Sequence, residues 1–317
     1  MTKPRIVLPG GSGFLGRVLA PYFVNKGYEV IVLSRQPAPI GEGIQTLPWD
    51  GCTHGPWAEA LEGATAVINL AGRSVNCRYH ARNRKLMMDS RVDSTRVLGE
   101  AIARCKTPPG VWMNSSTATI YKHSFDKPMD ESSLTGATPE AKDAFSIEVA
   151  TAWERTFEAA STPHTRKVLL RTAMVLDAMP GTVFRVLRNL AKRGLGGKMG
   201  TGKQYMSWIH SEDFCRALEF ILHREELCGV VNIAAPNPLP NREVMRLFRE
   251  IAGMPFGLPA AEWMLELGAF FLRTETELII KSRRVVPKRL LDAGFKFHHP
   301  ELPEALRQIE SNLRKRT

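Results

Sequence analysis

Three glycines near the start of the chain have the spacing that phosphate binding requires. Gly10, Gly13 and Gly16 follow the apolar run 6–8 and precede the amphipathic stretch 17–24. This order predicts a strand, a tight turn and a helix. In such a unit, glycines permit the turn, let a pyrophosphate approach the backbone and let the helix pack closely on the strand. The helix N-terminus adds N–H groups and the positive end of the helix dipole. We therefore predict a dinucleotide site, rather than a purely structural turn, formed by Gly10, Gly11, Ser12, Gly13, Phe14 and Leu15.

The end of the second predicted strand indicates which dinucleotide is bound. Residues 27–33 are mostly apolar, and Ser34 and Arg35 follow them. An NAD site usually has an acidic residue about 20 residues after the glycines, which accepts a hydrogen bond from the ribose 2′-hydroxyl. An arginine can instead pair with a 2′-phosphate, which a carboxylate would repel. Ser34 and Arg35 therefore predict NADP(H) rather than NAD(H). The alternative is that Arg35 is one of the many surface cations of this chain.

Strands and helices alternate through the first half of the chain. We predict strands within 64–72, 111–118 and 167–171, and helices over 82–104 and 141–160. This alternation is typical of an α/β fold with a doubly wound parallel sheet, covered by helices on both faces. Ligands of such folds bind beyond the carboxyl ends of the strands. We therefore add Leu70, Ala71, Gly72 and Ser115 to the cofactor site.

The pattern changes after about residue 175. Long loops follow, with a helix near 213–224, a strand over 230–234 and helices starting near Asn241 and Pro259. These elements predict a smaller C-terminal lobe. We place the dinucleotide-binding domain at 1–175 and the lobe at 176–317, from which later strands could return to the sheet.

Composition and charge narrow the classes of partner. The chain has a formal net charge of +11, and residues 281–317 carry ten Lys/Arg against four Asp/Glu. Apolar residues interrupt this basic tail, so we predict a solvated basic face that suits an anionic ligand, rather than a nucleic-acid site. The sequence has no run of 18 apolar residues, so we predict no membrane-spanning helix. We also predict no signal peptide before the first strand. Five cysteines without C-x-x-C spacing predict reduced thiols and a cytoplasmic protein.

Several motifs together resemble a known superfamily. Pro-Gly-Gly-Ser-Gly-Phe-Leu-Gly (9–16), Asn-Leu-Ala-Gly (69–72), Ser-Ser-Thr-Ala-Thr-Ile-Tyr (115–121) and Trp-Ile-His-Ser-Glu-Asp (208–213) resemble the extended short-chain dehydrogenases/reductases, which include nucleotide-sugar epimerases and dehydratases. Segments 89–95, 194–204 and 285–297 are similar to an atypical subgroup, labelled "epimerase family protein", that carries a small C-terminal domain of unknown function. The resemblance covers essentially the whole chain. It implies a Rossmann-type sheet, and homodimers are common in this superfamily.

The resemblance also implies catalytic positions, and two of them are altered. In extended reductases, a hydroxyl after the fourth strand binds the substrate oxygen, and Thr117 matches it. A Tyr four residues before a Lys then acts as acid/base, because the ammonium lowers the phenol pKa. In the helix predicted at 141–160, Phe145 or Ser146 stands at the Tyr position, depending on the register. Val149 or Ala150 correspondingly stands at the Lys position.

Other side chains could supply the missing proton transfer. Tyr121, beside Lys122, is the nearest phenol to Thr117, although a structural aromatic at the sheet edge is the stronger alternative for it. Tyr79, Lys85 and Tyr205 are further candidates without a geometric reason. Arg91 aligns with an Asn that lies near the cofactor in relatives. It could hold a phosphate or an anionic substrate, or pair with Asp89 or Asp93.

Two apparent ligand motifs are set aside. Residues 197–203 match the start of a phosphate-binding loop, but Gln204 replaces the Ser/Thr that Mg²⁺ needs and no strand precedes it. In relatives this loop borders the substrate cleft, where Lys203 could close over an anionic substrate; an ordinary surface loop is the alternative. His298 and His299 lack companions at metal-ligand spacing, so no metal site is predicted. His210 and Asp213 are expected to orient a loop and cap a helix.

The sequence thus supports two functions. The first is an NADP(H)-dependent oxidoreductase or epimerase-like enzyme acting on a small polar substrate, with anionic compounds included. The second is a non-catalytic NADP(H)-binding sensor or regulatory protein, which the missing Tyr/Lys pair favours. A true nucleotide-sugar epimerase is a narrower third option that the missing pair disfavours.

Overall fold

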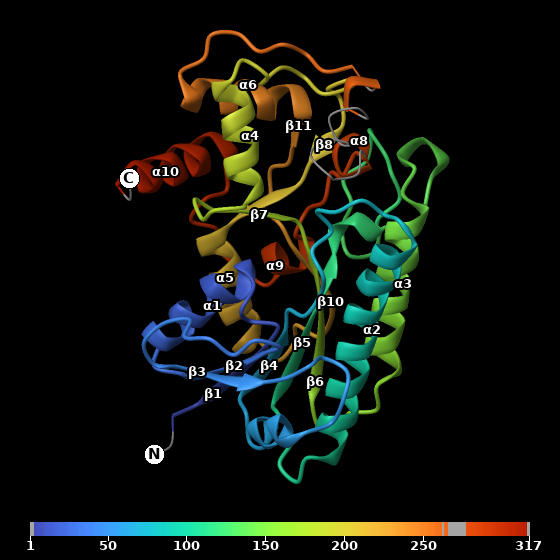
Figure 1. The fold of residues 1–317 in the computed structure, drawn as a ribbon, viewed down its shortest axis with the longest axis vertical. Coiled ribbons are helices and arrows are strands. Elements are labelled where there is room, and N and C mark those ends of the chain that lie inside the picture. The colour runs from blue at the N-terminus through green and yellow to red at the C-terminus, as the bar shows by residue number, and fades with distance from the viewer. Residues whose placement is uncertain (1–2, 262, 266–276, 316–317) are drawn as a thin grey trace.

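A seven-stranded parallel sheet forms the centre of the molecule. The computed structural model describes residues 3–261, 263–265 and 277–315 (Figure 1). All neighbouring strands are parallel, in the order β10-β6-β5-β4-β1-β2-β3. Their bounds are β1 Arg5–Pro9, β2 Glu29–Ser34, β3 Ile44–Pro48, β4 Ala66–Asn69, β5 Val111–Thr117, β6 Arg166–Thr172 and β10 Gly229–Ile233. The predicted doubly wound parallel sheet is confirmed.

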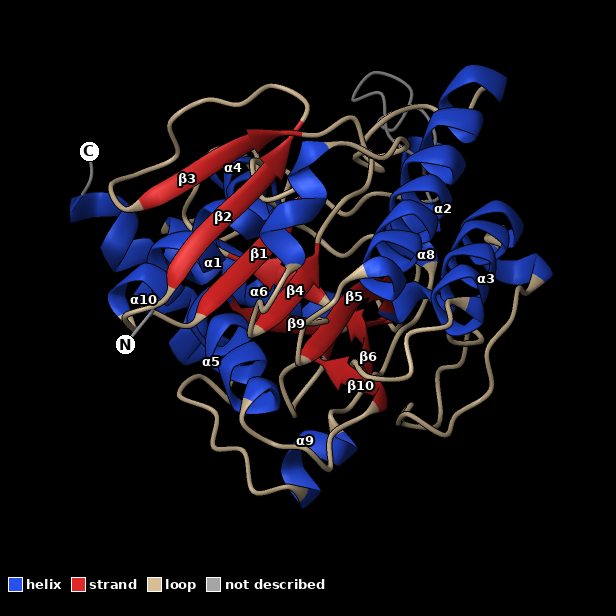
Figure 2. Cartoon of the chain, turned by 90° about the horizontal axis from the view of Figure 1, so that it is seen from below, coloured by secondary structure: helices blue, strands red, loops and turns tan. Residues whose placement is uncertain are grey.

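Helices cover both faces of this sheet. Helices α2 (Ala81–Arg104) and α3 (Ala144–Ala159) pack together on one face, and α1 (Phe14–Asn25) and α5 (Ser211–Leu222) cover the other (Figure 2). Side chains of β1 alternate between the faces. Ile6 and Leu8 pack with Phe23 and Phe214 of α1 and α5, whereas Val7 packs with residues of α2 and α3. No helix within the described ranges has the length and apolar character needed to cross a bilayer.

A smaller lobe with its own apolar core lies beyond the carboxyl edge of the sheet (Figure 1). Phe184, Phe248 and Leu306, from three helices, are among its buried side chains. Its strands pair as β7 with β9, in parallel, and β8 with β11, antiparallel. The remaining elements are β7 Met174–Leu176, α4 Val183–Lys192, β8 Tyr205–Met206, β9 Trp208–His210, β11 Leu239–Pro240, α6 Asn241–Ala252, α8 Glu277–Ile280, α9 Lys288–Asp292 and α10 Leu302–Lys315, with short 3₁₀ turns at η1 Pro56–Leu61, η2 Ala118–Ile120 and η3 Pro139–Ala141.

The part of the chain after residue 175 contributes to both the central sheet and the smaller lobe. After β7 and α4 it returns through α5 to β10, which joins the sheet beside β6. The division at residue 175 stays a prediction, since segments beyond it belong to the sheet as well as to the lobe. The expected helix near Asn241 is α6, whereas the one expected to start near Pro259 falls largely outside the described residues.

Candidate functional site

The carboxyl ends of three adjacent strands meet in one continuous edge. The N–H of Gly10, after β1, donates to the carbonyl of Leu33 in β2 at 2.9 Å. The N–H of Leu70, after β4, donates to the carbonyl of Pro9 at 2.9 Å. Gly10 has φ +74°, and a Cβ on it would lie 2.6 Å from the Cα of Ala71. Only glycine therefore fits where the loops after β1 and β4 touch.

The other glycines of this loop serve two different purposes. A Cβ at Gly11 would lie 2.9 Å from the Leu8 side chain, and one at Gly16 would overlap the backbone of Gly11, so both are required by packing. Gly13, at the N-cap of α1, is different. Its φ of −77° is ordinary, it is exposed, and a Cβ there would meet nothing closer than the Gly10 carbonyl at 3.6 Å. The protein does not itself require glycine at position 13, but a ligand approaching the helix N-terminus would.

Ser34 and Arg35 lie beside this loop, as the sequence predicts. Ser34 is buried at the end of β2, and its hydroxyl donates to the hydroxyl of Ser12 at 2.9 Å. Arg35 is exposed, and no hydrogen bond or ion pair joins it to another of the described residues. Ser12 is partly buried, and Phe14 and Leu15 form the partly buried first turn of α1. The edge therefore combines a glycine turn, two hydroxyls and an arginine without a protein partner in the described chain.

The turn after β4 is held from below by a buried side chain. Asn69 is fully buried, and its Oδ1 accepts from the N–H of Ala71 at 3.0 Å. Its amide donates to Oδ1 of Asn114 in β5 at 2.7 Å. Ala71 is buried and Gly72 is exposed. Asn69 thereby fixes the turn that faces the glycine loop.

Arg91 of α2 packs against this turn. If Gly72 carried a Cβ, that atom would lie 3.3 Å from Cζ of the Arg91 guanidinium. It donates to the carbonyls of Met87 and Arg73, both at 3.1 Å, and lies 5.1 Å from the ring centroid of Trp153. Burial lowers the pKa of this guanidinium. Arg91 therefore lies against the turn after β4, and it pairs with neither Asp89 nor Asp93 in the described structure.

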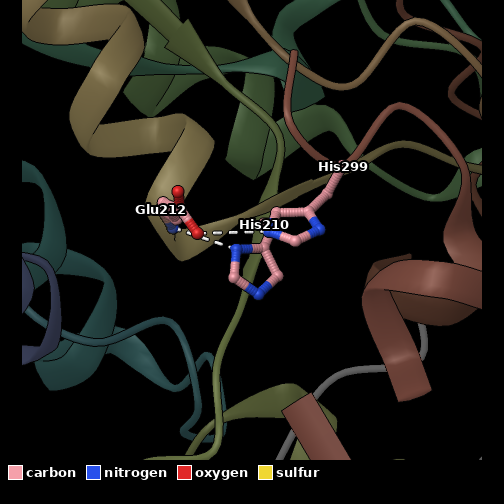
Figure 3. Close-up of side chains that lie close together, drawn as sticks. All are labelled: His210, Glu212 and His299. Carbon is pink, nitrogen blue, oxygen red and sulfur yellow. Dashed lines mark hydrogen bonds and ion pairs between the residues drawn. The ribbon is translucent and has the colours of Figure 1, made fainter. Parts of the chain in front are cut away.

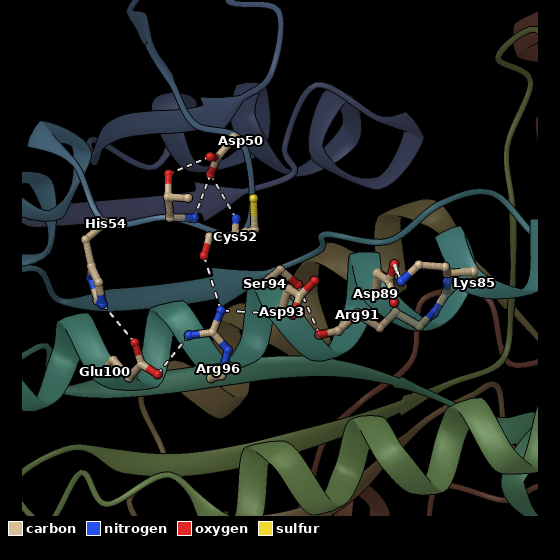
Figure 4. Close-up of polar contacts among 11 residues, drawn as sticks. Asp50, Cys52, His54, Lys85, Asp89, Arg91, Asp93, Ser94, Arg96 and Glu100 are labelled. Atoms are coloured by element: carbon tan, nitrogen blue, oxygen red, sulfur yellow. Dashed lines mark hydrogen bonds and ion pairs between the residues drawn. The ribbon is translucent and has the colours of Figure 1, made fainter. Parts of the chain in front are cut away.

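The exposed face of α2 is occupied by ordinary ion pairs. Lys85 pairs with Asp89 at 2.8 Å, and Arg96 pairs with Glu100 at 2.9 Å (Figure 4). Arg96 also donates to the carbonyl of Cys52, which ties the loop after β3 to the helix. Lys85 thus has a surface role in this structure, which gives no support to it as a proton donor.

The end of β5 brings the predicted hydroxyls to the same edge. Ser115 is buried within the strand, and Thr117 is partly buried at its last position. The Thr117 hydroxyl accepts from the N–H of Thr119 at 3.1 Å and so caps η2. Among the described residues, no acceptor takes the proton of this hydroxyl, so it can point toward a ligand as a substrate-binding hydroxyl requires.

Tyr121 lies in an interior environment. It is 0% exposed, and its hydroxyl donates to Oδ1 of Asn232 at 2.7 Å. The guanidinium of Arg171 lies 4.9 Å from its ring centroid. Burial raises its pKa even though Arg171 and Asn232 oppose the shift. These features match the structural alternative for Tyr121 and leave it without access to a ligand in this structure.

Helix α3 uses other residues where the resemblance implies Tyr and Lys. Phe145 packs edge-on against Tyr79, with ring centroids 5.3 Å apart. Val149 and Ala150 are buried apolar residues. Tyr205, the last of the candidate phenols, is partly buried in β8 under the guanidinium of Arg284, 4.9 Å from its ring centroid. The geometry places none of these groups as a replacement acid/base pair.

Two buried polar networks replace that pair, and sequence reasoning missed both. In the first, Trp153 donates to the Thr95 hydroxyl at 3.0 Å, which donates onward to Asn114 at 3.4 Å. In the second, Glu154 accepts from both Arg171 Nε (3.0 Å) and Nη2 (2.8 Å). The Ser116 hydroxyl also donates to Glu154, at 2.5 Å. These groups tie α3 to the sheet just below the site.

A segment from the C-terminal part of the chain also reaches the site. We name residues 281–286 the C-terminal strap. Lys281 is 1% exposed, forms an ion pair with Asp143 at the start of α3 and donates to the carbonyl of Thr119 at 2.5 Å. Arg283 donates to the Thr119 hydroxyl at 3.0 Å. Two cations from the strap thus contact Thr119, two positions after Thr117 in the sequence, which no local sequence signal indicated.

The loop at 197–203 is packed against the lobe. A Cβ at Gly197 would overlap the backbone of Leu258, and the N–H of Gly197 donates to the Leu258 carbonyl at 3.2 Å. The buried side chain of Gln204 donates to the carbonyl of Met199 at 2.8 Å. Lys203 is exposed. These contacts are those of a structural loop and give no sign of a phosphate cradle.

His210 and Asp213 behave partly as expected. His210 caps α5, because its Nδ1 accepts from the N–H of Glu212 at 3.1 Å. Asp213 instead accepts from the backbone N–H groups of His298 at 2.8 Å and His299 at 2.7 Å. It therefore anchors the segment before α10 rather than capping a helix.

Comparisons with known proteins agree with this geometry. A sequence model described as "NAD dependent epimerase/dehydratase family" matches residues 6–234, and one described as "Domain of unknown function (DUF1731)" matches residues 260–309. The "Epimerase family protein SDR39U1" of Bos taurus is 30% identical over 311 residues, covering 96% of this chain and 99% of the relative. The "Epimerase family protein YfhF" of Bacillus subtilis is 29% identical over 307 residues, covering 96% and 97%. The crystal structure of human epimerase family protein SDR39U1 with NADPH superposes with a TM-score of 0.84 at 29% identity, covering 98% of this chain and all of that one.

Proposed function

Because the chain belongs to the NAD dependent epimerase/dehydratase family, we propose that it binds NADP(H) at the edge formed by β1, β2 and β4 and acts on a small polar substrate. One observation carries the proposal. Gly13 is the glycine of the loop that the protein's own packing does not require, and Arg35 lies near it without a partner among the described residues. Both positions are explained by a ligand that carries a pyrophosphate and a further phosphate. The human relative crystallised with NADPH supports the same assignment.

The residues present fit this cofactor. The backbone at Gly13, Phe14 and Leu15 would hold the pyrophosphate at the start of α1. Ser34 and Arg35 would hold the 2′-phosphate, since Arg35 offers a planar set of donors and no carboxylate directly follows β2 to repel it. The turn of Leu70, Ala71 and Gly72, with Arg91 and Ser115 around it, would line the remaining path toward β5.

The substrate is proposed to lie against Thr117. When bound, NADP(H) supplies a carbon that accepts or gives a hydride. The Thr117 hydroxyl can donate to a substrate oxygen, and it is held in place by the N–H of Thr119. Arg283 places a guanidinium at Thr119, and Arg91 places another at the Gly72 turn. These cations favour a substrate with a carboxylate or phosphate group.

The second candidate function is an NADP(H)-binding sensor without catalysis. It is favoured by the burial of Tyr121 and by the absence of Tyr and Lys from their usual positions in α3, where Val149 or Ala150 stands in place of Lys. The two functions differ in one measurement. Oxidation of NADPH in the presence of a panel of small carboxylated or phosphorylated carbonyl compounds supports the enzyme, whereas tight binding without turnover across the panel supports the sensor.

Location and assembly are further proposals. All five cysteines are free thiols, in agreement with a reducing compartment such as the cytoplasm. A homodimer is proposed by analogy with extended reductases. Sedimentation of the purified chain measures the assembly directly, and a monomer at all concentrations would contradict it.

Titration calorimetry with NADPH and NADH tests the cofactor assignment. We expect the wild-type protein to prefer NADPH. Arg35→Ala should weaken NADPH binding about tenfold or more, a loss of ~1.4 kcal/mol, with little effect on NADH. Arg155→Ala, which removes an exposed arginine from the outer face of α3, is the matched control and should change neither affinity. Equal losses for both cofactors in Arg35→Ala would contradict the 2′-phosphate contact.

A further inference from the structure

Three metal-ligating side chains from distant parts of the chain meet outside the cofactor edge. His210 ends β9, Glu212 lies in the first turn of α5, and His299 precedes α10 (Figure 3). One ligand atom of each lies within 4.8 Å of the other two. Glu212 and His299 are 87 positions apart, so their spacing in the sequence gave no hint of this cluster. We predicted no metal site from the sequence, because the histidines lack companions at metal-ligand spacing.

The protonation of His210 is fixed by its two partners. The backbone N–H of Glu212 can only donate, so Nδ1 of His210 accepts and carries no proton. Nε2 is then the protonated nitrogen, and it lies 2.9 Å from Oε1 of Gln308, which accepts from it. Metal-binding histidines are held in the same way, with the second ring nitrogen donating to an outer partner. The Nδ1 lone pair therefore points toward Glu212, where it accepts from the backbone N–H in this structure, and a metal bound at Nδ1 would take the place of that hydrogen bond.

The other two side chains are already near coordination distance. Nε2 of His299 lies 3.2 Å from Oε2 of Glu212. Ligand atoms around a tetrahedral Zn²⁺, each about 2.0–2.1 Å from the metal, lie ~3.3 Å from one another. His210 and His299 stack with ring centroids 4.0 Å apart. A modest movement of the partly buried Glu212 side chain would complete the approach.

The surrounding structure holds both sides of the cluster. Asp213 accepts from the backbone N–H groups of His298 and His299, which fixes this segment against α5. Nδ1 of His298 lies 2.7 Å from Oε1 of Glu212 and orients the carboxylate. Two imidazoles and a carboxylate form a donor set that Zn²⁺ binds well.

We propose that His210, Glu212 and His299 form a binding site for a divalent cation of the Zn²⁺ class. His210 and Glu212 belong to the segment matched by the epimerase family, and His299 belongs to the segment matched by the domain of unknown function. The metal would therefore fasten the C-terminal segment to the sheet domain. The site shares no residue with the proposed cofactor edge and is proposed as a structural one, with a water or His298 in the fourth position.

Zinc titration of the full-length, tag-free chain tests this proposal. After treatment with a chelator, the protein is titrated with Zn²⁺ in competition with a chromophoric indicator. We expect one Zn²⁺ per chain with micromolar or tighter affinity, weakened tenfold or more in His299→Ala and Glu212→Gln. His54→Ala is the matched control, because His54 forms a comparable exposed pair with Glu100 at 2.7 Å but has no third ligand. Its affinity should equal that of the wild type.

A second readout separates metal binding from misfolding. The Co²⁺-substituted protein should show the visible absorption of a four-coordinate nitrogen/oxygen site, and the spectrum should be lost in His299→Ala while that variant still binds NADPH. Zn²⁺ should raise the melting temperature of the wild type but not of His299→Ala. Absence of stoichiometric Zn²⁺ binding, or wild-type affinity in both ligand variants, would overturn the proposal.

Discussion

The two halves of the sheet's carboxyl edge differ in how exposed their groups are and in whether other side chains bind them. Around β1, β2 and β4, Gly13, Arg35 and Gly72 are exposed, and Arg35 has no partner among the described residues. Around β5 and α3, Tyr121 and Glu154 are buried and bonded to other side chains. The first half holds exposed groups that a ligand can reach, whereas Tyr121 and Glu154 in the second half are committed to the fold and Thr117 alone is proposed to contact the substrate there.

The difference shows how one edge can bind a cofactor without the usual acid/base residues. A buried polar group needs a partner, and once it has one it stabilises the protein and cannot serve a ligand as well. Glu154 and Arg171 illustrate this. Burial alone would lower the pKa of Arg171, but the hydrogen bonds from Arg171 to Glu154 outweigh it and raise the pKa. The pair is a structural link between α3 and β6.

Gly16→Ala should have the largest effect of the variants that test this comparison. Its Cβ would overlap the backbone of Gly11, which neither segment can relieve by a side-chain rotation. We expect a loss of about 5 kcal/mol in the free energy of unfolding, near the upper end for single substitutions. Denaturant unfolding measures it, and a stability within 1 kcal/mol of wild type, on the order of an ordinary substitution, would contradict the packing role.

Glu154→Gln tests the structural half. It leaves Arg171 buried without its carboxylate, which should cost about 3–5 kcal/mol of stability. NADPH affinity, measured at a temperature where the variant is folded, should be unchanged because Glu154 lies below the cofactor edge. A variant with wild-type stability and lost NADPH binding would reverse the assignment of the two halves.

Gly13→Ala tests the ligand half. The added methyl group meets only the Gly10 carbonyl, at 3.6 Å, so stability should change by less than about 1 kcal/mol. Affinity for NADPH should fall about tenfold or more, equivalent to ~1.4 kcal/mol, because the methyl group enters the space that the pyrophosphate needs. Calorimetric titration checks the affinity, and an unchanged value would remove the main support for this site.

Tyr121→Phe should reduce stability less than Glu154→Gln does. It removes the hydrogen bond to Asn232 and should reduce stability by about 1–2 kcal/mol. NADPH affinity, and the pH dependence of any turnover found, should match the wild type. A change in the pH profile without a loss of stability would instead assign Tyr121 to proton transfer.

The sequence predicted the strands, the glycine turn and the helix start around β1 and β2, because their signals are local. The glycine spacing, the apolar runs beside it and the residues after the second strand all lie within about 35 positions. Each therefore indicates a strand, a turn or a helix terminus without knowledge of distant contacts. The positions of Arg91 and of the Gly72 turn could be predicted from the resemblance and the rule for strand ends.

The rest depends on contacts between distant residues. Lys281 and Asp143 are 138 positions apart, and Tyr121 is buried by partners such as Asn232, 111 positions away. Single-sequence patterns do not specify such pairs, because burial of one side chain depends on how the other elements pack. The β3 strand and the C-terminal strap were missed for the same reason.

A crystal structure of this chain with NADP⁺ tests the central claim most directly. The account predicts the pyrophosphate over the N–H groups at Gly13, Phe14 and Leu15, and the 2′-phosphate at hydrogen-bond distance from Arg35 and Ser34. It also predicts that the nicotinamide lies toward Thr117, with Tyr121 still buried against Asn232. A cofactor bound elsewhere, or a 2′-phosphate that points away from Arg35, would contradict it.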